Sequence, residues 1–305
     1  MRFVPNEDQA AFLSVLDQMI EPQKAWRVSP NWSRYDWSAE FDAVLEESGF
    51  YDCAAEESLG LEAAAIMTYR LASLPVLVES AASSMLRTLF APELPRPIAV
   101  IEGKFNSVAP YLPIARSVVW IDEDSVQTAV LPEGAVEQVE SIFAYPMGVL
   151  NTDALDWQTV ETDPDIVRDA WRVGLAAEMA GCLKGGLDAV VAHVRDRHQF
   201  GRPLGSFQSI QHRLATAAVK VEGAYWLTLR AAQNLGTAEP ATALGYVQEA
   251  STQIVHDLHQ FMGAMGLTLE HPLHRWTYRV RLLRTSLGGA GVNLGNVATT
   301  RWRAA

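Results

Sequence analysis

The sequence predicts an α+β protein in which helical segments flank a small β-rich segment. Apolar residues recur at helical spacing up to about residue 92, Pro, Val and Ile become frequent from 92 to about 160, and long helical patterns return after Asp163. We therefore expect an N-terminal helical domain at 1–91, a reduced middle β domain at 92–162 and a C-terminal four-helix-bundle domain at 163–305.

The N-terminal segment carries helix signals from its start. Asn6 is a candidate N-cap, and the acidic Glu7 and Asp8 behind it suit the positive end of a helix dipole. A helical pattern that begins at Phe41 stops at Gly49, and an alanine-rich pattern with its own apolar face runs over 61–90. The repeated apolar faces predict a helical bundle.

The middle segment reads as short strands separated by breaks. Pro110, Pro113 and a turn at 122–125 divide it into pieces. The expected strands lie in the runs IAVIE at 98–102, SVVWID at 117–122, VQTAVL at 126–131 and VEQVES at 136–141. This length of chain suffices for a compact sheet.

Three long helices are expected in the C-terminal segment, with a fourth possible after them. The first runs over 165–197, the second over 206–235 until Gly236 closes it, and the third over 241–262. Helices of this length after a β segment predict a four-helix bundle.

Composition excludes several classes of protein. The 305 residues carry 24 Lys and Arg against 36 Asp and Glu, a formal net charge of −12, whereas nucleic-acid binders show a basic patch or stripe. No apolar run approaches the roughly 20 residues of a membrane span, so we expect no membrane and a cytoplasmic location. Cys53 and Cys182 stand apart without metal-ligand spacing, which favours buried thiols over a disulfide or a metal site.

The sharpest local motif is RHQFGRPL, from Arg197 to Leu204, in the loop between two long helices and followed by Phe207 and Gln208. Arg197 and Arg202 could clamp phosphate oxygens, because guanidinium groups donate paired hydrogen bonds to them. On its own, such a loop is more often an interhelical turn with surface arginines.

This motif resembles the C-terminal domain signature of the acyl-CoA dehydrogenase family. The resemblance extends through GLAAEMAGCLKGGLDAVVAHVRDRHQFGRPLGSFQSIQHRLATAAVKVEGA and covers 165 to about 295, while FDAVLEESGF resembles the family's N-terminal helical domain. It implies the acyl-CoA dehydrogenase fold, with the middle β domain shortened here.

A second motif, QFMGAMG from Gln260 to Gly266, resembles the family's Q-x-x-G-G-x-G loop, with Ala264 as a mild departure. On its own, Gly263 would mark a helix end. In the family, both motifs reach across a dimer interface to the neighbouring subunit's FAD. The resemblance therefore implies that the cofactor-binding residues are Arg197, Gln199, Phe200, Leu204, Phe207, Gln208, Gln260, Phe261, Gly263 and Ala264.

The catalytic residues that the family requires are not found. Family members take the substrate's α-proton with a glutamate, and its two known positions correspond here to Gly288 and Trp171, neither of which accepts a proton. Glu178 and Glu270 are conceivable relocated bases, but we favour solvated or structural acids for both.

Two further features do not point to a site of this chain's own. His256, His259, His271 and His274 lack a convincing set of carboxylates, so no metal site is expected. The family's Trp-Ile/Ser-Thr segment, which packs on the flavin ring, is not found, and Trp120 reads as a core aromatic residue.

These observations lead to one main hypothesis and two alternatives. The chain would complete the FAD site of a full-length acyl-CoA dehydrogenase subunit in an α2β2 heterotetramer like those of bacterial steroid degradation. That partner would bind most of the acyl-CoA, and an electron-transfer flavoprotein or similar acceptor would take the electrons. The alternatives are an autonomous homo-oligomeric dehydrogenase with a relocated base and a cofactor-free scaffold subunit.

Overall fold

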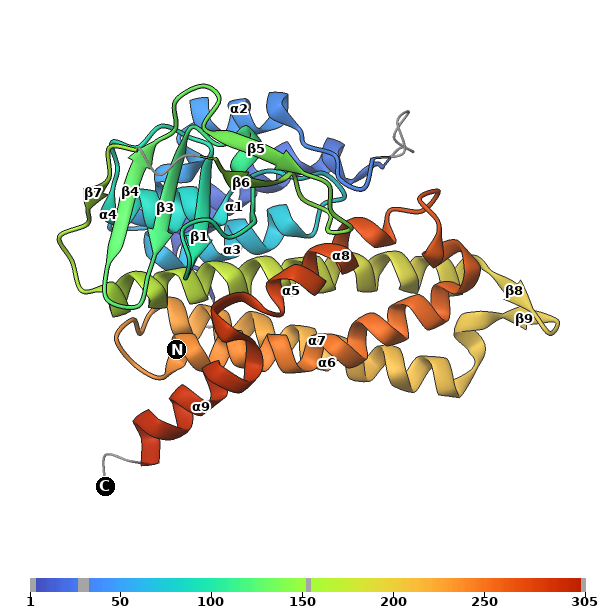
Figure 1. Cartoon of the computed structure of the whole chain (residues 1–305). Helices are drawn as coiled ribbons and strands as arrows, with labels where there is room; N and C mark the ends of the chain where they lie inside the picture. The colour runs from blue at the N-terminus through green and yellow to red at the C-terminus, as the bar shows by residue number, and fades with distance from the viewer. Residues whose placement is uncertain (1–3, 27–32, 152–154, 303–305) are drawn as a thin grey trace.

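The computed structural model describes residues 4–26, 33–151 and 155–302, and its helices and sheets follow the expected order (Figure 1). Helices α1 (Glu7–Ile20), α2 (Ala39–Glu47) and α3 (Gly60–Ala72) come first. Asn6 caps α1 as predicted: its side-chain oxygen accepts from the Gln9 backbone N–H at 2.7 Å, and its own N–H donates to the Gln9 side chain at 3.1 Å. Gly49 has φ +73° after α2, which confirms the predicted stop.

The alanine-rich stretch at 61–90 is not one continuous helical pattern, which corrects the prediction. Helix α3 ends at Ala72, and the chain becomes helical again only in a π-helical turn (Ala82–Arg87) and α4 (Thr88–Phe90). Pro75 disfavours helical backbone before it and lacks an N–H to donate. The carboxylate of Glu79 then accepts from the backbone N–H groups of Ala82 and Ser83, both at 3.1 Å, and so starts the second segment.

All four predicted strands are present. A four-stranded sheet has the order β1-β3-β4-β7, with β1 and β3 parallel and the other pairs antiparallel. A second, antiparallel sheet has the order β2-β6-β5. The strands are β1 (Ile98–Glu102), β2 (Ala109–Pro110), β3 (Ser117–Ile121), β4 (Val126–Val130), β5 (Val136–Val139), β6 (Met147–Leu150) and β7 (Gln158–Thr159), of which β2, β6 and β7 were not predicted.

The C-terminal helices also match the prediction, with ends that differ by a few residues. They are α5 (Pro164–Asp196), α6 (Gln208–Ala232), α7 (Glu239–Met262), α8 (Leu273–Leu283) and α9 (Gly289–Trp302). A hairpin of β8 (His198–Gln199) and β9 (Arg202–Pro203) joins α5 to α6 and projects beyond the end of the bundle (Figure 1). No helix in the described ranges is long and apolar enough to span a bilayer.

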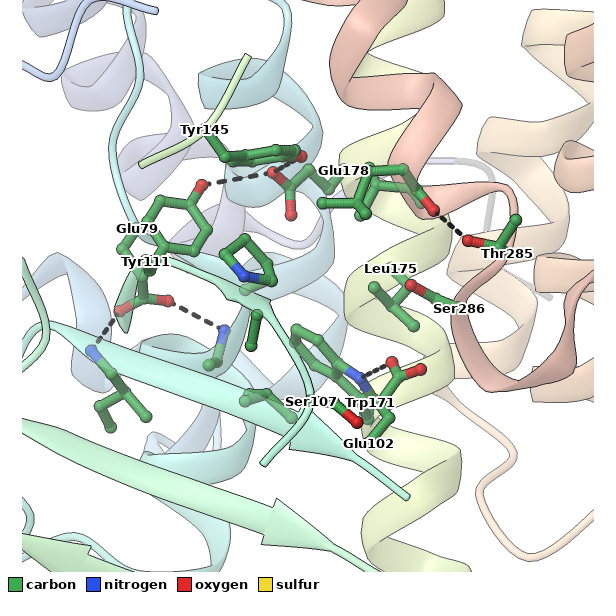
Figure 2. A pocket seen from close by; sticks show the side chains of 18 of the residues that line it. Glu79, Glu102, Ser107, Tyr111, Tyr145, Trp171, Leu175, Glu178, Thr285 and Ser286 are labelled. Carbon is green, nitrogen blue, oxygen red and sulfur yellow. Dashed lines mark hydrogen bonds between the residues drawn. The ribbon is translucent and has the colours of Figure 1, made fainter. Parts of the chain in front are cut away.

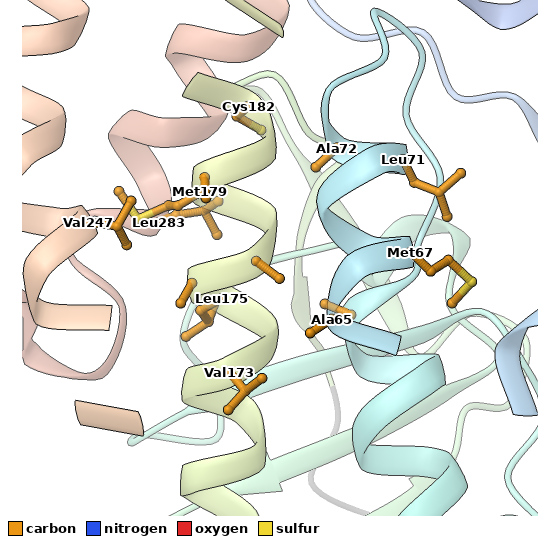
Figure 3. Close-up of a cluster of buried hydrophobic side chains, with 14 of the residues drawn as sticks. Ala65, Met67, Leu71, Ala72, Val173, Leu175, Met179, Cys182, Val247 and Leu283 are labelled. Carbon is orange, nitrogen blue, oxygen red and sulfur yellow. The ribbon is translucent and has the colours of Figure 1, made fainter. Parts of the chain in front are cut away.

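Helix α5 lies at the centre of the core and is covered on several sides. Figure 3 shows Ala65 and Ala72 of α3 on the side toward α5, and Val247 of α7 with Leu283 of α8 beside another face of α5. Cys182 of α5 is a buried free thiol, as is Cys53, which confirms that prediction. A helix enclosed in this way needs apolar or small residues around most of its circumference.

Two glycines allow α3 to lie close against α5. A Cβ on Gly181 would lie 2.2 Å from the Tyr69 carbonyl oxygen, and one on Gly185 would lie 2.4 Å from the Ser73 carbonyl oxygen. Neither position can hold a larger residue unless the backbone of α3 moves away. The small residues of α5 therefore fix its position beneath the N-terminal helices.

Candidate functional site

A small cavity lies where the end of the sheet meets α5 and the segment after α8. Its volume is about 180 Å³, and we call it the sheet–helix cavity (Figure 2). Typical small-molecule sites have roughly 300–1,000 Å³. Its polar lining residues are Glu79, Glu102, Ser107, Tyr111, Tyr145, Trp171, Glu178, Thr285 and Ser286.

Glu178 is a buried acid of this cavity. Its carboxylate accepts a hydrogen bond from the Tyr145 hydroxyl at 2.8 Å and a longer one from the Tyr111 hydroxyl at 3.4 Å. Burial raises the pKa of Glu178, while buried Arg279 and the two tyrosine hydroxyls act in the opposite direction. Of the two roles expected for Glu178, a solvated acid is therefore wrong.

Trp171, which the resemblance aligned with one of the two family base positions, points toward the same cavity. Its indole N–H donates to one oxygen of Glu102 at 2.8 Å, and the backbone N–H of Leu287 donates to the other at 2.7 Å. Burial raises the pKa of Glu102, and these two donors partly offset that effect. Glu102 thus ties strand β1 to α5 and to the segment after α8.

Gly288, which the resemblance aligned with the second family base position, has a backbone that disfavours a side chain. Leu287, Gly288 and Gly289 have consecutive φ values of +49°, +79° and +72°. A Cβ on Gly288 would lie 2.6 Å from a γ-carbon of Val292. Any residue with a Cβ here is strained by both the left-handed backbone and this contact.

The predicted hairpin motif lies at the far end of α5 from the cavity. Phe200 and Gly201 form its tip with φ values of +54° and +79°, the geometry of a type I′ turn that favours Asn or Gly. Phe200 is 86% exposed. Its ring meets that of Phe207 edge-on at 6.1 Å, and the Arg202 guanidinium lies 4.0 Å from the Phe207 ring centre.

The other predicted hairpin residues also face outward. Arg197, Gln199 and Gln208 are exposed, and Leu204 is half-buried. An exposed aromatic ring at a strained turn does not stabilise the fold through burial. Strained backbone of this kind is concentrated at functional sites. These side chains are accessible to a ligand outside the chain.

The glutamine loop lies at the same end of the bundle as the hairpin. Gln260, Gly263 and Ala264 are exposed, whereas Phe261 is buried with the Arg213 guanidinium 4.7 Å from its ring centre. Arg213, near the start of α6, also pairs with Asp257, near the end of α7. Both motifs are therefore brought together, as one outward-facing surface.

Residues of the two motifs cannot serve the sheet–helix cavity of their own chain. From Glu178 to Arg197 the chain advances roughly 28 Å along α5, at about 1.5 Å per residue. The side chains at the hairpin are instead open to the outside of the chain. The sheet–helix cavity, by contrast, is too small for a flavin ring together with an acyl group.

Glu270 and Trp120 occupy the positions that their non-catalytic interpretations predicted. Glu270 is exposed, which confirms a solvated acid. The indole of Trp120 packs near Phe105 and Trp157 at the edge of a core cluster. Within the described ranges, no three His, Cys, Asp or Glu side chains are grouped in a way that could hold a metal ion.

Sequence reasoning missed Glu102, Tyr111 and Tyr145. The signal for Glu102 was an acid at the end of an otherwise apolar strand, IAVIE. The two tyrosines gave no local signal, because they meet Glu178 only through contacts between residues far apart in the sequence.

Comparisons with known proteins agree with this geometry. The family model "Acyl-CoA dehydrogenase, C-terminal domain" matches residues 169–300. The mitochondrial short-chain specific acyl-CoA dehydrogenase of Rattus norvegicus is 37% identical over 119 residues, 37% of this chain and 29% of that protein. The acyl-CoA dehydrogenase FadE34 of Mycobacterium tuberculosis is 30% identical over 156 residues, 49% of this chain and 22% of that protein. The chain thus matches less than a third of the length of these curated relatives.

Solved structures match almost the whole chain in fold. The ChsE4-ChsE5 complex from Mycobacterium tuberculosis has a TM-score of 0.80 at 20% identity, over 98% of each chain. The Tcur3481-Tcur3483 steroid ACAD G363A variant has a TM-score of 0.78 at 19% identity, also over 98% of each chain. Residues 169–300 therefore match the acyl-CoA dehydrogenase C-terminal domain, and the chain shares its fold along nearly its whole length with these solved structures.

Proposed function

We propose that this chain is the FAD-site-completing subunit of a heteromeric acyl-CoA dehydrogenase whose full-length partner supplies the catalytic base. The proposal depends on the distance between the two motifs and the sheet–helix cavity. The exposed residues Arg197, Phe200 and Gln260 lie together at one end of α5, and the cavity lies toward the other end. At the two family base positions stand Gly288 and Trp171, and Trp171 is hydrogen-bonded to Glu102.

The reaction proposed for the complex is the α,β-desaturation of an acyl-CoA. FAD, when bound, supplies the acceptor for the hydride that leaves the β-carbon. Of this chain's residues, Arg197 would donate hydrogen bonds to phosphate oxygens, Phe200 would cover an apolar part of the cofactor, and the small residues Gly263 and Ala264 would admit it close to the backbone. The partner's glutamate would remove the α-proton.

A steroid-derived acyl group and an α2β2 assembly are the finer parts of the proposal. They rest on fold similarity to the ChsE4-ChsE5 complex and to a protein described as a steroid ACAD. An electron-transfer flavoprotein or similar acceptor would then reoxidise the cofactor. A shared fold does not by itself specify a substrate, which is determined by the residues that line the site of the assembled complex.

A second candidate is an autonomous dehydrogenase with Glu178 as its base. Glu178 lies in the sheet–helix cavity, and burial raises its pKa, as an acid–base residue near neutral pH would require. The small cavity volume and the hydrogen bonds from Tyr145 and Tyr111 favour a structural acid instead.

The first experiment tests the chain by itself. The full chain is purified without a partner, and its visible spectrum and acyl-CoA turnover are measured. We expect less than one flavin per chain and no turnover. Stoichiometric flavin together with turnover would establish the autonomous enzyme and refute the partner-dependent role.

The second experiment tests the chain in its complex. The chain is co-expressed with an acyl-CoA dehydrogenase subunit encoded beside it, and flavin is counted per complex for Arg197→Ala and for Arg195→Ala as the control. Both arginines are exposed, but Arg195 pairs with Asp196 and lies outside the motif. We expect flavin loss with Arg197→Ala alone. Unchanged flavin content and activity would favour a cofactor-free scaffold.

A further inference from the structure

The first turns of α6 lie between the two motifs of the exposed surface. Helices α6 and α7 run side by side in opposite directions, so the start of α6 faces the end of α7 (Figure 1). The hairpin enters α6 at Phe207, and the glutamine loop leaves α7 after Met262. The start of α6 is therefore the place where a contact can fix one motif relative to the other.

Stacked side chains hold the hairpin to the start of α6. Phe207 is the N-cap residue of this helix. The Arg202 guanidinium of β9 lies 4.0 Å from its ring centre, and Phe200 at the tip meets the same ring edge-on at 6.1 Å. A cation over an aromatic face and an edge-on ring pair are both favourable contacts. The position of the hairpin tip therefore follows that of Phe207.

Arg213, about two turns further along α6, holds the end of α7. It lies roughly 9 Å along the helix from Phe207, at about 1.5 Å per residue. Its guanidinium lies 4.7 Å from the ring centre of Phe261 and pairs with the buried carboxylate of Asp257. The side-chain amide of Gln253 donates to the same carboxylate oxygen at 2.7 Å. One arginine thus contacts the last turns of α7 through both a charge and a ring.

The glutamine loop is open at Gly263 and closely packed at Gly266. Gly263 has φ +66° and ψ −146°, close to a backbone region essentially confined to glycine, and a Cβ there would meet no atom within 4 Å. A Cβ on Gly266 would lie 2.9 Å from Met262 and 3.3 Å from Leu273 of α8. The open part adjoins Phe261, so its position depends on how Arg213 holds that ring.

A second ion pair joins the same two helices at their other end. Arg230 of α6 donates to Glu239 of α7 at 2.8 Å. The side chains of this pair are 51% and 13% exposed, and those of Arg213 and Asp257 are 41% and 6% exposed. Pairs of such similar exposure should contribute similarly to stability. The Arg230 pair is therefore a matched control, because it ties α6 to α7 far from the motifs.

We propose that Arg213 is a positioning residue for the surface that the two motifs form. It holds Phe261, and with it the exposed Gln260, at a fixed distance from the hairpin that Phe207 anchors. The consequence for a cofactor rests on the proposed function, since the surface is there assigned to the partner's FAD. The placement of the loop by Arg213 does not rest on it and is measured on this chain alone.

The position of the loop is measured on the purified full chain by NMR of labelled methionine methyl groups. Met265 lies in the loop and is 43% exposed, and Met265→Leu identifies its signal. Arg213→Gln should shift or broaden this signal, whereas Arg230→Gln should leave it as in wild type. An unchanged signal in Arg213→Gln, or an equal change in both variants, would overturn the proposal.

Two measurements separate position from folding. The melting temperatures of Arg213→Gln and Arg230→Gln should fall by similar amounts, because the acid of each pair keeps a second donor, Gln253 or Arg301. Arg213→Lys retains the charge opposite Asp257, so it should recover part of the change in the Met265 signal. No recovery at all would mean that the charge does not place the loop, and the proposal would fail.

The consequence for the cofactor is measured in the co-expressed complex. The dissociation constant of flavin should rise by about threefold to tenfold in Arg213→Gln, the cost of ordering a side chain that is no longer held, and by less than about twofold in Arg230→Gln. If Arg197→Ala loses flavin while Arg213→Gln keeps the wild-type affinity, the positioning role alone is overturned. If both variants keep their flavin, the proposed function fails, and the Met265 signal still decides whether Arg213 places the loop.

Discussion

The left-handed backbone at Gly288 leads to a quantitative prediction about stability. Replacing Gly288 with Ala places a Cβ at φ +79° and 2.6 Å from Val292. The left-handed backbone costs about 1–2 kcal/mol for a residue with a Cβ. Overpacking adds about 1 kcal/mol or more, depending on how far Val292 can move. We expect Gly288→Ala to lower the free energy of unfolding by about 2 kcal/mol or more.

The assay is urea unfolding followed by circular dichroism, with two matched variants. Gly291→Ala is the control, because a Cβ there meets no atom within 4 Å and its φ is ordinary, so it should be neutral or stabilise the chain by up to about 1 kcal/mol. In a Val292→Ala background the contacts with the two γ-carbons are removed but the 2.8 Å contact with the Cβ of residue 292 remains, so Gly288→Ala should lose only part of its packing cost.

Equal free energies of unfolding for Gly288→Ala and Gly291→Ala would refute this reasoning. If the prediction holds, Gly288→Glu carries the same cost. A glutamate could then not be placed at residue 288 by one substitution without loss of stability.

Three further predictions concern other parts of the chain. Burial raises the pKa of Glu178 in the folded chain, so the native state keeps this proton to higher pH than the unfolded chain does. The free energy of unfolding of the wild type should therefore fall from about pH 4.3 upward, by at most about 1.4 kcal/mol per pH unit for this one group. In Glu178→Gln this decline should be shallower. Denaturant titrations at several pH values check this, and parallel curves would contradict it. Gly181→Ala should lower the free energy of unfolding, measured by heat or urea, by about 1–3 kcal/mol, because the added Cβ meets a backbone oxygen of α3. Gly295→Ala is the control, because a Cβ there meets no atom within 4 Å and should not destabilise the chain. Equal stability of the two variants would disprove the close contact. Phe200→Ala should change the free energy of unfolding by less than about 0.5 kcal/mol, since the ring is 86% exposed, but should reduce the flavin retained by the complex; a large loss of stability would mean that the ring is part of the core.

Local signals in the sequence predicted much of the fold. The Asn6 cap, the Gly49 stop and the four main strands each depend on a few adjacent residues, and all are present. The break after Ala72 was missed, because the alanine-rich pattern outweighed Pro75 and the cap supplied by Glu79 depends on its burial.

The candidate site likewise has one part that the sequence predicted and one part that it did not. The hairpin and the glutamine loop were predicted from contiguous motifs, and they lie together because α6 and α7 are antiparallel. The sheet–helix cavity could not be predicted, since its bonds join Glu102 to Leu287 and Tyr145 to Glu178 across long stretches of sequence. Distant pairings of this kind leave no periodic pattern.

The length of helix α5 also sets the distance between two parts of the molecule. Its middle is held against α3 by Gly181 and Gly185, and its far end carries the hairpin. One inserted residue after Gly185 would advance the hairpin by about 1.5 Å and turn it by about 100°. Phe200 would then point in a different direction from the bundle, so the number of residues in this helix determines which surface a neighbouring subunit can meet.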